Sequence, residues 1–584
     1  MPVSTMILKS DPGIKRDGTK FDGNFYTDGQ WVRFQRGLPR KIGGYYAVNK
    51  YLSEVSRGFS NYTQQDLVYC HSGSANYLSA FNIDTDANSS VISDRTPTTL
   101  TASPNNSWMF DYQYDPSASE NYVLAHVSPN LNSIQNATGG QIFYGTVTGT
   151  GPLTETPLPA GANATGGIVV LHPFLFYYGS DGVVGWGVPG TASGGTGNII
   201  DLVGTGSGIA RVWSSKIIKG MPLRAGSGSA PAGLFWAYDA VIRCTFTGGS
   251  TVFQFDVIAT DTSIMSENCV VDYDGVFYWV GVDRFLMFNG VVREIPNQMN
   301  LNYFFDGLNQ AQKSKVFAFK VTRYGEIWFA YPRGEATECT HAVIFNVREN
   351  TWYDTELPNG GRSAGSFNNY FAAPLLTGTE LGSPDFTIVG TTLDDDPVIT
   401  GLSTTANLFA GMIVSSPHVP NIAIASVDSP TQITLATGEG VIAATYPLNF
   451  YYGYHVWLHE KGVDEINGQT VQPILSYFET ADLSTIAQGG KNEYLRITTI
   501  EPDFVQKGPM TVQVTGRANA RAPEVYSSRF TFPETASQPF EQIVMLKEQR
   551  RELRVRFESN ALYGDYQMGQ IIGHMDSGDG TTIA

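Results

Sequence analysis

The sequence is poor in cysteine and in long apolar runs. Its four cysteines, Cys70, Cys244, Cys269 and Cys339, are scattered through 584 residues without CxxC spacing. This spacing argues against a disulfide framework, so we expect reduced, buried thiols in a chain that folds in a reducing cytosol. No stretch approaches the roughly 18 uninterrupted apolar residues of a transmembrane helix, and the N-terminus has no apolar run long enough for a signal peptide. We therefore expect no membrane-spanning segment.

Charged residues are also scarce, and basic ones most of all. Charged residues make up 16% of the chain, with 37 basic against 54 acidic residues and a formal net charge of −17. A protein that grips nucleic acid by neutralising phosphates would present a basic face, so this class of function is disfavoured. An acidic wall repels the phosphodiester backbone without holding it, which suits a conduit through which DNA passes.

Glycine and aromatic residues are abundant instead. The chain has 62 Gly, 30 Tyr, 33 Phe and 9 Trp. Aromatic side chains fit pleated, half-buried surfaces, and glycine supplies turns, so the composition predicts an all-β protein with little helix. A chain of this length exceeds one ordinary hydrophobic core, and we expect two to four domains.

Residues 270–358 predict two consecutive β units of related design. In the first unit, strands at 276–280 and 285–288 precede Asn289-Gly290, a pair that favours a tight hairpin. The second unit is complete, with strands at 316–321, 326–331, 341–346 and 351–353. Strand, turn, strand, loop, strand, turn, strand is the content of one β-propeller blade. Because one blade is too small to fold alone, we expect neighbouring blades.

Short strands bounded by Gly, Asn, Ser and Pro continue this pattern between about residues 52 and 258. Their spacing favours a propeller or a sandwich, and the strict periods of known propeller repeats are missing. Five to seven blades fit. We expect a β-propeller body over residues 51–383, with a closing blade at 451–490.

Two regions depart from the blade pattern. Residues 384–450 contain no Trp, are rich in Thr, Ser and Ala, and alternate apolar with small polar residues. They predict a small inserted β module that resembles an immunoglobulin-like or small-barrel repeat, placed in a loop near an outer rim. Residues 491–584 alternate apolar and polar residues, as strands with one wet face do, and predict a C-terminal β-sandwich-like platform.

The N-terminal segment, residues 1–50, is unusually basic. It contains nine Lys or Arg and four Asp, a local balance of +5 in a chain of −17. One interpretation is a solvated charged strand. The other is a docking surface for an acidic ring or for DNA, and its candidate residues are Arg33, Arg36, Arg40 and Lys41.

Candidate reactive groups are better explained by structure. His459 and Glu460 begin a helical zinc motif, but Val463 stands where the second His is needed, so a structural His459 is preferred. Residues 394–396, three consecutive Asp, could bind calcium, but an acidic turn before a proline is the commoner explanation. Residues 180–186 have a weak likeness to the Asp-containing turn of sialidases, but a plain hairpin is preferred. The aromatic residues 277–279 are interpreted as blade core and not as a sugar-binding platform. No Walker loop, nucleophile elbow or regular carboxylate pair is present. We therefore expect no enzyme activity, cofactor or metal.

Four segments, taken in order, resemble one known family. They read W-V-R-F-Q-R-G-L-P-R-K-I-G-G-Y at residues 31–45 with P-G-I-K-R-D-G-T before it, G-E-I-W-F-A-Y-P at 325–332, Y-H-V-W-L-H-E-K-G at 454–462, and R-R-E-L-R-V-R-F-E-S-N-A-L-Y-G-D-Y-Q-M-G-Q-I-I-G-H-M-D-S-G-D-G at 550–580. The chain is similar here to tail proteins of short-tailed bacteriophages that form the tail tube or nozzle. The resemblance spans nearly the whole chain except the inserted module.

The resemblance implies a structural virion protein located at the tail tip and assembled in the host cytoplasm. It implies a ring, most often a hexamer, that continues the portal and adaptor channel, helps to retain packaged DNA and lets it exit without sequence-specific binding. The expected partners are further copies, an adaptor protein, and tail fibres or spikes. Two alternatives stay open: a propeller that binds or degrades glycans, and a fibre attachment hub without a channel.

Overall fold

The structure is a computed structural model that describes most of the chain. The described residues are 4–20, 23–83, 92–115, 118–129, 139–162, 164–190, 200–223, 230–249, 251–483, 494–519, 521–534 and 543–578. Helix within these ranges is limited to α1 (Leu301–Gly307) and two short 3-10 turns, η1 (Ser180–Gly182) and η2 (Gln310–Lys315). None of the described helices has the length and apolar character needed to cross a bilayer. The expectation of an all-β chain is confirmed.

In the described part of the chain, six four-stranded antiparallel sheets follow one another, each built from consecutive strands. The first three sheets contain β8 (Gly58–Gln64), β9 (Leu67–Gly73), β10 (Leu78–Ile83) and β11 (Ser93–Asp94); β12 (Asn106–Asp115), β13 (Glu120–Pro129), β14 (Gln141–Thr146) and β15 (Thr154–Thr156); and β16 (Gly167–Leu171), β17 (Phe174–Tyr178), β18 (Val183–Trp186) and β19 (Gly208–Arg211). The next three contain β20 (Ile217–Pro222), β21 (Ala232–Ala237), β22 (Ala240–Phe246) and β23 (Phe253–Thr260); β24 (Val270–Tyr273), β25 (Val276–Val280), β26 (Phe285–Phe288) and β27 (Val292–Glu294); and β28 (Phe317–Val321), β29 (Glu326–Tyr331), β30 (His341–Asn346) and β31 (Thr351–Glu356).

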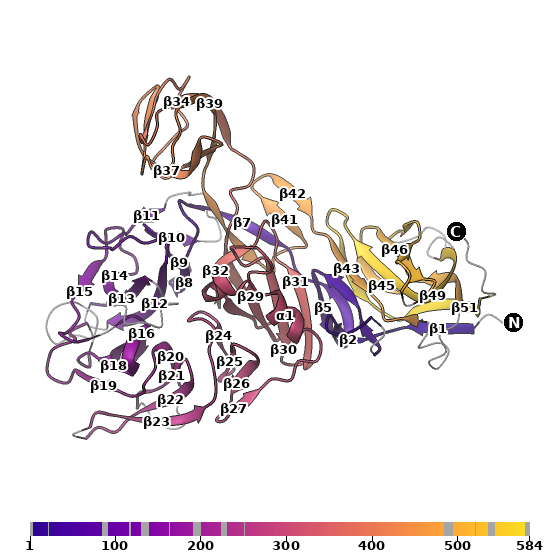
Figure 1. The fold of residues 1–584 in the computed structure, drawn as a ribbon, viewed down its shortest axis with the longest axis horizontal. Helices are drawn as coiled ribbons and strands as arrows, with labels where there is room; N and C mark the ends of the chain where they lie inside the picture. Colours follow the sequence, from indigo (N-terminus) through magenta and orange to yellow (C-terminus); the bar gives the residue numbers. More distant parts are fainter. Residues whose placement is uncertain are drawn as a thin grey trace.

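A seventh sheet closes the ring with strands from distant parts of the chain. Its order is β32 (Arg362–Asn368), β33 (Ala373–Gly378), β40 (Tyr454–His459), β7 (Tyr45–Leu52), β41 (Asp464–Asn467) and β42 (Thr470–Pro473). First strands lie beside each other from β8 through β12 and β16 to β20 and from β24 through β28 to β32, and β32 lies beside β8, so the series returns to its start. Figure 1 shows these sheets arranged radially, which is the architecture of a β-propeller. In the described residues the ring has seven sheets, at the upper end of the expected range.

The inserted region forms a separate sheet with its own core. Its order is β34 (Phe386–Thr392), β39 (Ala444–Tyr451), β36 (Ile413–Ser416), β37 (Val419–Ser429), β38 (Gln432–Leu435) and β35 (Val398–Ile399). Its buried side chains, Leu402, Met412, Val414, Ile433 and Leu448 among them, form one cluster of their own. In Figure 1 this module projects away from both the ring and the C-terminal region. Its immunoglobulin-like character stays a prediction.

The two ends of the chain fold together beside the ring (Figure 1). One nine-stranded sheet contains β1 (Ser4–Leu8), β51 (Ile571–Ser577), β44 (Leu495–Glu501), β49 (Val544–Ser559), β43 (Ser476–Glu479), β4 (Asp28–Gln30), β46 (Met510–Arg517), β47 (Val525–Tyr526) and β48 (Phe530–Phe532). A four-stranded sheet contains β45 (Phe504–Lys507), β50 (Asp565–Met568), β6 (Leu38–Lys41) and β5 (Val32–Gln35), and a short pair contains β2 (Asp11–Ile14) and β3 (Phe25–Tyr26). We call this region, residues 4–41 with 476–578, the platform.

The structure differs from the sequence-based expectations in two domain boundaries and in the detail of one hairpin. Residues 45–50, expected in the N-terminal segment, belong to the ring, because β7 completes the seventh sheet by pairing with β40. Residues 476–479, expected in the closing blade, belong to the platform through β43. Asn289-Gly290 does make a hairpin between β26 and β27, but of the two only Gly290 has a positive φ (111°). Sequence periodicity identified the strands, whereas long-range pairing assigned them to sheets.

Candidate functional site: the junction between ring and platform

The four segments that resemble the phage family meet at one place, the junction between ring and platform. The hairpin of β5 and β6 belongs to the first segment and pairs with β50 in the last, where Gln567 opposes Arg40. Arg33 on β5 forms ion pairs with Glu326 at the start of β29 and with Glu460 just after β40. Segments more than 500 residues apart in sequence therefore share one site.

Arg33 lies at the centre of this junction and is fully buried. Its Nη1 and Nη2 donate to the two carboxylate oxygens of Glu460 at 2.9 and 2.5 Å. Nη2 also donates to Glu326 Oε2 at 3.1 Å, and Nε lies 2.8 Å from Glu326 Oε1. The guanidinium carbon is 3.7 Å from the centroid of the Tyr324 ring. One planar cation thus joins two ring strands to the platform hairpin, a geometry that suits Arg and not Lys.

Glu326 is the buried anion on the ring side. Besides Arg33 it accepts hydrogen bonds from Trp328 Nε1 at 2.9 Å and from the Tyr353 hydroxyl at 2.6 Å. Burial raises the pKa of Glu326, while the Arg33 charge and these two donors favour its ionised form. Burial opposes the charged form of Arg33, but the carboxylates of Glu326 and Glu460 outweigh it and raise the pKa of Arg33. The group is an ion triad in which each member depends on the others.

Trp31 fixes the backbone where the platform enters the junction. Its φ of 52° is in the left-handed region, which is costly for a large side chain. The conformation is held at both backbone polar groups: its N–H donates to Thr355 Oγ1 at 3.0 Å, and its carbonyl accepts from Ser476 Oγ at 2.8 Å and from the Ile42 N–H at 3.1 Å. The indole packs edge-on against Trp328 at a ring distance of 6.3 Å.

The turn between β5 and β6 is clamped by the ring. Arg36 and Gly37 both have positive φ, 56° and 71°, as a two-residue type I′ hairpin requires. Their backbone N–H groups donate to the two oxygens of Glu349, at 2.8 and 3.0 Å. The turn is therefore formed by Arg36 and Gly37, and a ring carboxylate holds it.

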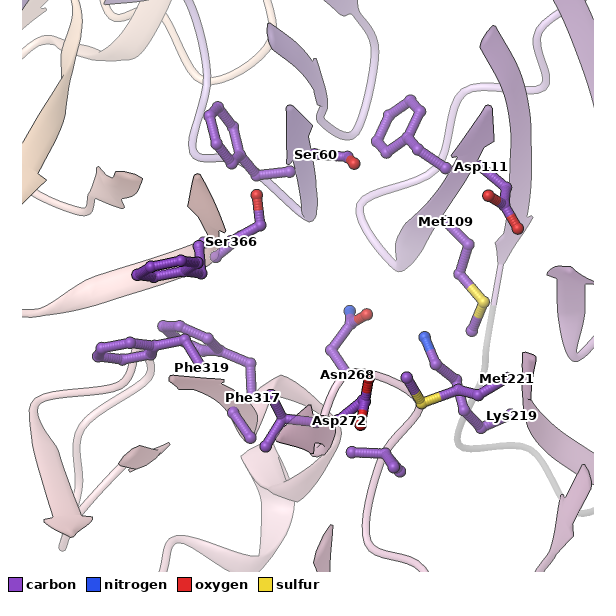
Figure 2. Close-up of a pocket in the computed structure, with 18 of the residues that line it drawn as sticks. Ser60, Met109, Asp111, Lys219, Met221, Asn268, Asp272, Phe317, Phe319 and Ser366 are labelled. Atoms are coloured by element: carbon purple, nitrogen blue, oxygen red, sulfur yellow. The ribbon is translucent and has the colours of Figure 1, made fainter. Parts of the chain in front are cut away.

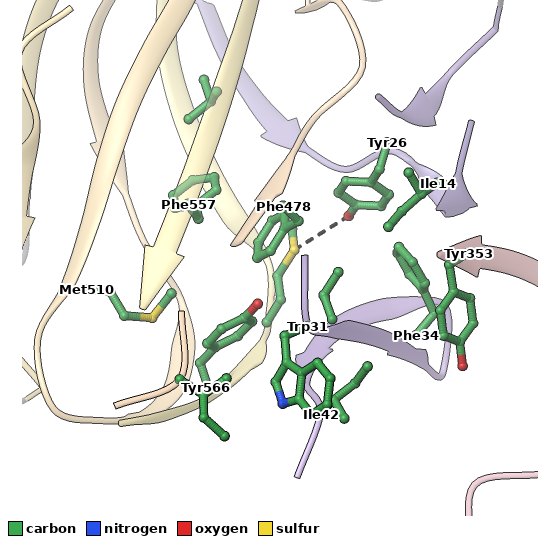
Figure 3. Close-up of a cluster of buried hydrophobic side chains, with 14 of the residues drawn as sticks. Ile14, Tyr26, Trp31, Phe34, Ile42, Tyr353, Phe478, Met510, Phe557 and Tyr566 are labelled. Carbon is green, nitrogen blue, oxygen red and sulfur yellow. Dashed lines mark hydrogen bonds between the residues drawn. The ribbon is translucent and has the colours of Figure 1, made fainter. Parts of the chain in front are cut away.

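A shared hydrophobic core fills the space behind these polar contacts. Figure 3 shows Tyr26 and Phe34 between the ring residue Tyr353 and the platform residue Phe478. The Phe34 and Tyr353 rings are 5.5 Å apart, and the Tyr26 and Phe478 rings are 5.6 Å apart. Trp31 also belongs to this cluster, which runs without a break from the sixth sheet into the platform. Ring and platform are thereby joined by both charge and packing.

A second ion cluster ties the N-terminal segment to the ring. Arg16 Nε donates to Asp354 Oδ1 at 3.0 Å, and its Nη1 donates to Asp28 Oδ1 at 2.5 Å. Burial opposes the charge on Arg16, but Asp354 and Asp28 raise its pKa well above the usual value. The N-terminal basic residues are thus used partly inside the fold.

The four predicted docking residues fall into two groups. Arg33 and Lys41 are buried, so their charges do not reach a partner across the surface. Lys41 Nζ donates to the Gly564 carbonyl at 2.7 Å, and burial lowers its pKa to about 8. Arg36 is exposed, and half-buried Arg40 donates to Gln35 Oε1 at 2.7 Å. The docking hypothesis stays a prediction for Arg36 and Arg40 alone.

The remaining sequence candidates have structural surroundings. Buried His459 accepts from Arg362 Nε at 3.1 Å and stacks on the Tyr45 ring, and burial followed by the Arg362 charge lowers its pKa well below the usual value. Asp394, Asp395 and Asp396 each accept a hydrogen bond from a backbone N–H of the module. Among the described residues, no group of three or more His, Cys, Asp or Glu has a metal-binding arrangement.

Sequence reasoning missed Glu326 and Glu460 as partners of Arg33. The available signal was a glutamate at the start of the apolar strand E-I-W-F-A-Y, where a charge entering a core needs a counter-charge. The residue that supplies it could not be identified from sequence, because Arg33 lies 293 positions away. The four cysteines are free and buried, as expected.

Comparisons with known proteins add little to these observations. No family model matches the chain, and no curated protein sequence matches it. Among the solved structures that the chain resembles, YCF48 bound to D1 peptide aligns with 63% of this chain and 94% of its own, at 10% identity and a TM-score of 0.30. Similarity at this level is too weak to support an argument about this chain.

Proposed function

We propose that this chain is a structural protein of a bacteriophage virion. Several copies would assemble into an oligomeric ring that forms the tail nozzle. The observation that carries the proposal is the convergence of all four family-like segments on the Arg33 junction. Segments that resemble one family and meet at one structural site share a single role there. That role is to lock the propeller and the platform into one rigid body.

Rigidity of this kind suits a channel component. A subunit that holds packaged DNA under pressure must transmit force between its contact with the adaptor ring and its distal part without bending. The shared core and the buried ion triad provide such a connection. Six copies would carry about −102 formal charges, six times −17, and acidic groups facing a lumen would let DNA slide past.

The finer assignments belong to the same proposal. The nine-stranded and four-stranded sheets face each other through Phe478, Phe504, Phe557 and Tyr566, which supports a β-sandwich-like platform. Arg36 and Arg40 are the residues proposed to face the adaptor ring. The inserted module, proposed to be immunoglobulin-like, projects from the body (Figure 1), and this placement favours fibre or spike attachment as an additional role in the same assembly.

The proposal is tested by the mass and shape of the assembled protein. Mass photometry of the purified chain, alone and with the adaptor protein encoded by the same phage, is expected to show a ring. Six copies of the 63.6 kDa chain correspond to about 380 kDa. Negative-stain images are expected to show an open axis continuous with the adaptor. A chain that stays monomeric with its adaptor present contradicts the proposal, as does turnover of a host polysaccharide.

The docking residues are tested in the same assay. Replacing Arg36 and Arg40 with alanine is expected to weaken binding to the adaptor and to reduce its dependence on salt, because rim charges act mainly through electrostatic steering. The control is Lys313→Ala, which removes an exposed charge on the propeller. Unchanged assembly of the double variant at physiological salt would remove the docking role.

A further inference from the structure

The first strands of all seven ring sheets enclose a cavity on the propeller axis. Its volume is about 360 Å³, within the range of small-molecule sites. Figure 2 shows side chains from widely separated parts of the chain pointing toward this space. Neither the resemblance nor the proposed nozzle role assigns it a ligand.

Seven polar side chains line the cavity: Ser60, Asp111, Lys219, Asn268, Asp272, Lys320 and Ser366. Four of them, Ser60, Asp272, Lys320 and Ser366, hydrogen-bond to other residues of the chain, which leaves three polar groups of different kinds available to a ligand. Asp111 is oriented by two backbone N–H groups, those of Tyr112 at 2.8 Å and Val170 at 2.7 Å, which leave lone pairs available. Lys219 and Asn268 extend toward the open space, and no hydrogen bond from either side chain to another described residue is found. The cavity thus holds a carboxylate acceptor, an ammonium donor and an amide that can do both.

The charges of these groups limit what can bind. Burial lowers the pKa of Lys219, while the nearby carboxylates of Glu267 and Asp111 favour its charged form. An anionic ligand would meet these carboxylates, and a cationic ligand would meet the ammonium. A neutral ligand whose groups both donate and accept avoids both conflicts. Hydroxyl groups have this property, because each can donate to Asp111 and accept from Lys219 or Asn268.

Much of the remaining lining is apolar, beside Ser60, Ser366, Asp272 and Lys320. Phe317, Phe319, Met109 and Met221 surround the polar groups in Figure 2. Aromatic and thioether surfaces pack against C–H groups, so a ligand with hydroxyls on its edges and C–H groups on its faces would satisfy the whole lining. Sugars have this distribution of groups.

We propose that the axial cavity binds a neutral carbohydrate of mono- or disaccharide size through Asp111, Lys219 and Asn268. The polar side chains hydrogen-bond the hydroxyls, and the apolar walls pack against the faces of the sugar ring. This inference does not depend on the nozzle role, because the cavity is formed within one propeller whatever assembly the chain enters.

Saturation-transfer difference NMR on the full-length protein tests the proposal. The probes are glucose, galactose, rhamnose and N-acetylglucosamine, each with titration to obtain Kd, and acetate and methylammonium as charged probes. At least one sugar is expected to show saturation transfer, and the charged probes are not. Absence of transfer to all four sugars overturns the proposal, as does preferential binding of either ion.

Two variants locate the site. Lys219→Met and Asn268→Leu are each expected to weaken sugar binding, roughly tenfold or more for Lys219→Met because a charged hydrogen bond is lost. Lys313→Met, on the exposed surface, is expected to bind as the parent does. Thermal melting checks that each variant folds. If Lys219→Met fails to fold, the Asn268→Leu variant still tests the site. Unchanged affinity in the folded variants places any binding elsewhere and refutes the proposal.

Discussion

Replacing Arg33 with methionine tests whether the ion triad joins ring and platform. The substitution keeps a flexible apolar side chain of similar length but leaves Glu326, which is fully buried, and Glu460, whose side chain is 10% exposed, without their cation. Removing one partner of a buried pair costs about 3–5 kcal/mol, because the remaining charge stays desolvated. Loss of the contact with Tyr324 adds about 1 kcal/mol. We expect Arg33→Met to destabilise the chain by roughly 4–6 kcal/mol.

The measurement is denaturant unfolding followed by tryptophan fluorescence, because Trp31 and Trp328 pack against each other at the junction. The transition that reports the junction is expected to shift strongly in Arg33→Met and hardly at all in Arg36→Met, whose side chain is exposed. Adding Glu326→Gln to Arg33→Met is expected to restore part of the loss, because the uncompensated carboxylate is removed.

Two results would refute this reasoning. The first is a cost for Arg33→Met no larger than that for Arg36→Met, which would mean that the triad contributes nothing net. The second is strict additivity of the Arg33 and Glu326 substitutions, which would show that the two charges are not coupled in solution.

Two further predictions concern buried histidines and close packing. Burial lowers the pKa of His71 to about 3 and that of His126 to about 4, whereas the unfolded chain binds these protons near pH 6.5. The unfolding free energy is therefore highest above pH 6.5 and falls as the pH drops, because the unfolded chain then binds protons that the folded chain does not. Between pH 6.5 and 5 we expect a loss of about 2 kcal/mol per histidine. An unfolding free energy that does not change over this range in the parent would contradict the prediction. A Cβ on Gly73 would lie 2.2 Å from Cγ of Trp108, so Gly73→Ala is expected to cost about 1–3 kcal/mol in thermal or chemical unfolding. Gly151→Ala, which meets no atom within 4 Å, is the control, and equal stability of the two variants would show that the Gly73 site relaxes freely.

Much of the local structure follows from the sequence. Residues 276–280 and 326–331 coincide with β25 and β29, because runs of aromatic and β-branched residues bounded by turns have few alternatives to a buried strand. The composition of residues 384–450 likewise indicates the inserted module. This segment has no tryptophan and many small polar residues, whereas the blade strands are rich in aromatic residues. The structural interpretation of His459 also agrees with its buried position beside Arg362.

The use of the N-terminal basic residues could not be predicted from sequence. A run of arginines and lysines suggests a surface, but Arg33 and Lys41 are buried because their partners, Glu460 and the Gly564 carbonyl, come from distant segments. The axial cavity has the same origin, since Asp111, Lys219 and Asn268 belong to different sheets. Nothing in the local sequence around any one of them indicates that the other two are near.

The sequence by itself determined that the chain is built of short strands, where some of them begin and end, and where a differently composed segment interrupts them. Strand periodicity and turn chemistry act over a few residues, and so they can be seen in one dimension. Only the tertiary structure decided how many sheets close the ring, which strand completes it and which charges are buried. Those outcomes depend on pairing and desolvation between residues hundreds of positions apart, where a buried charge persists only if the fold brings its partner to it.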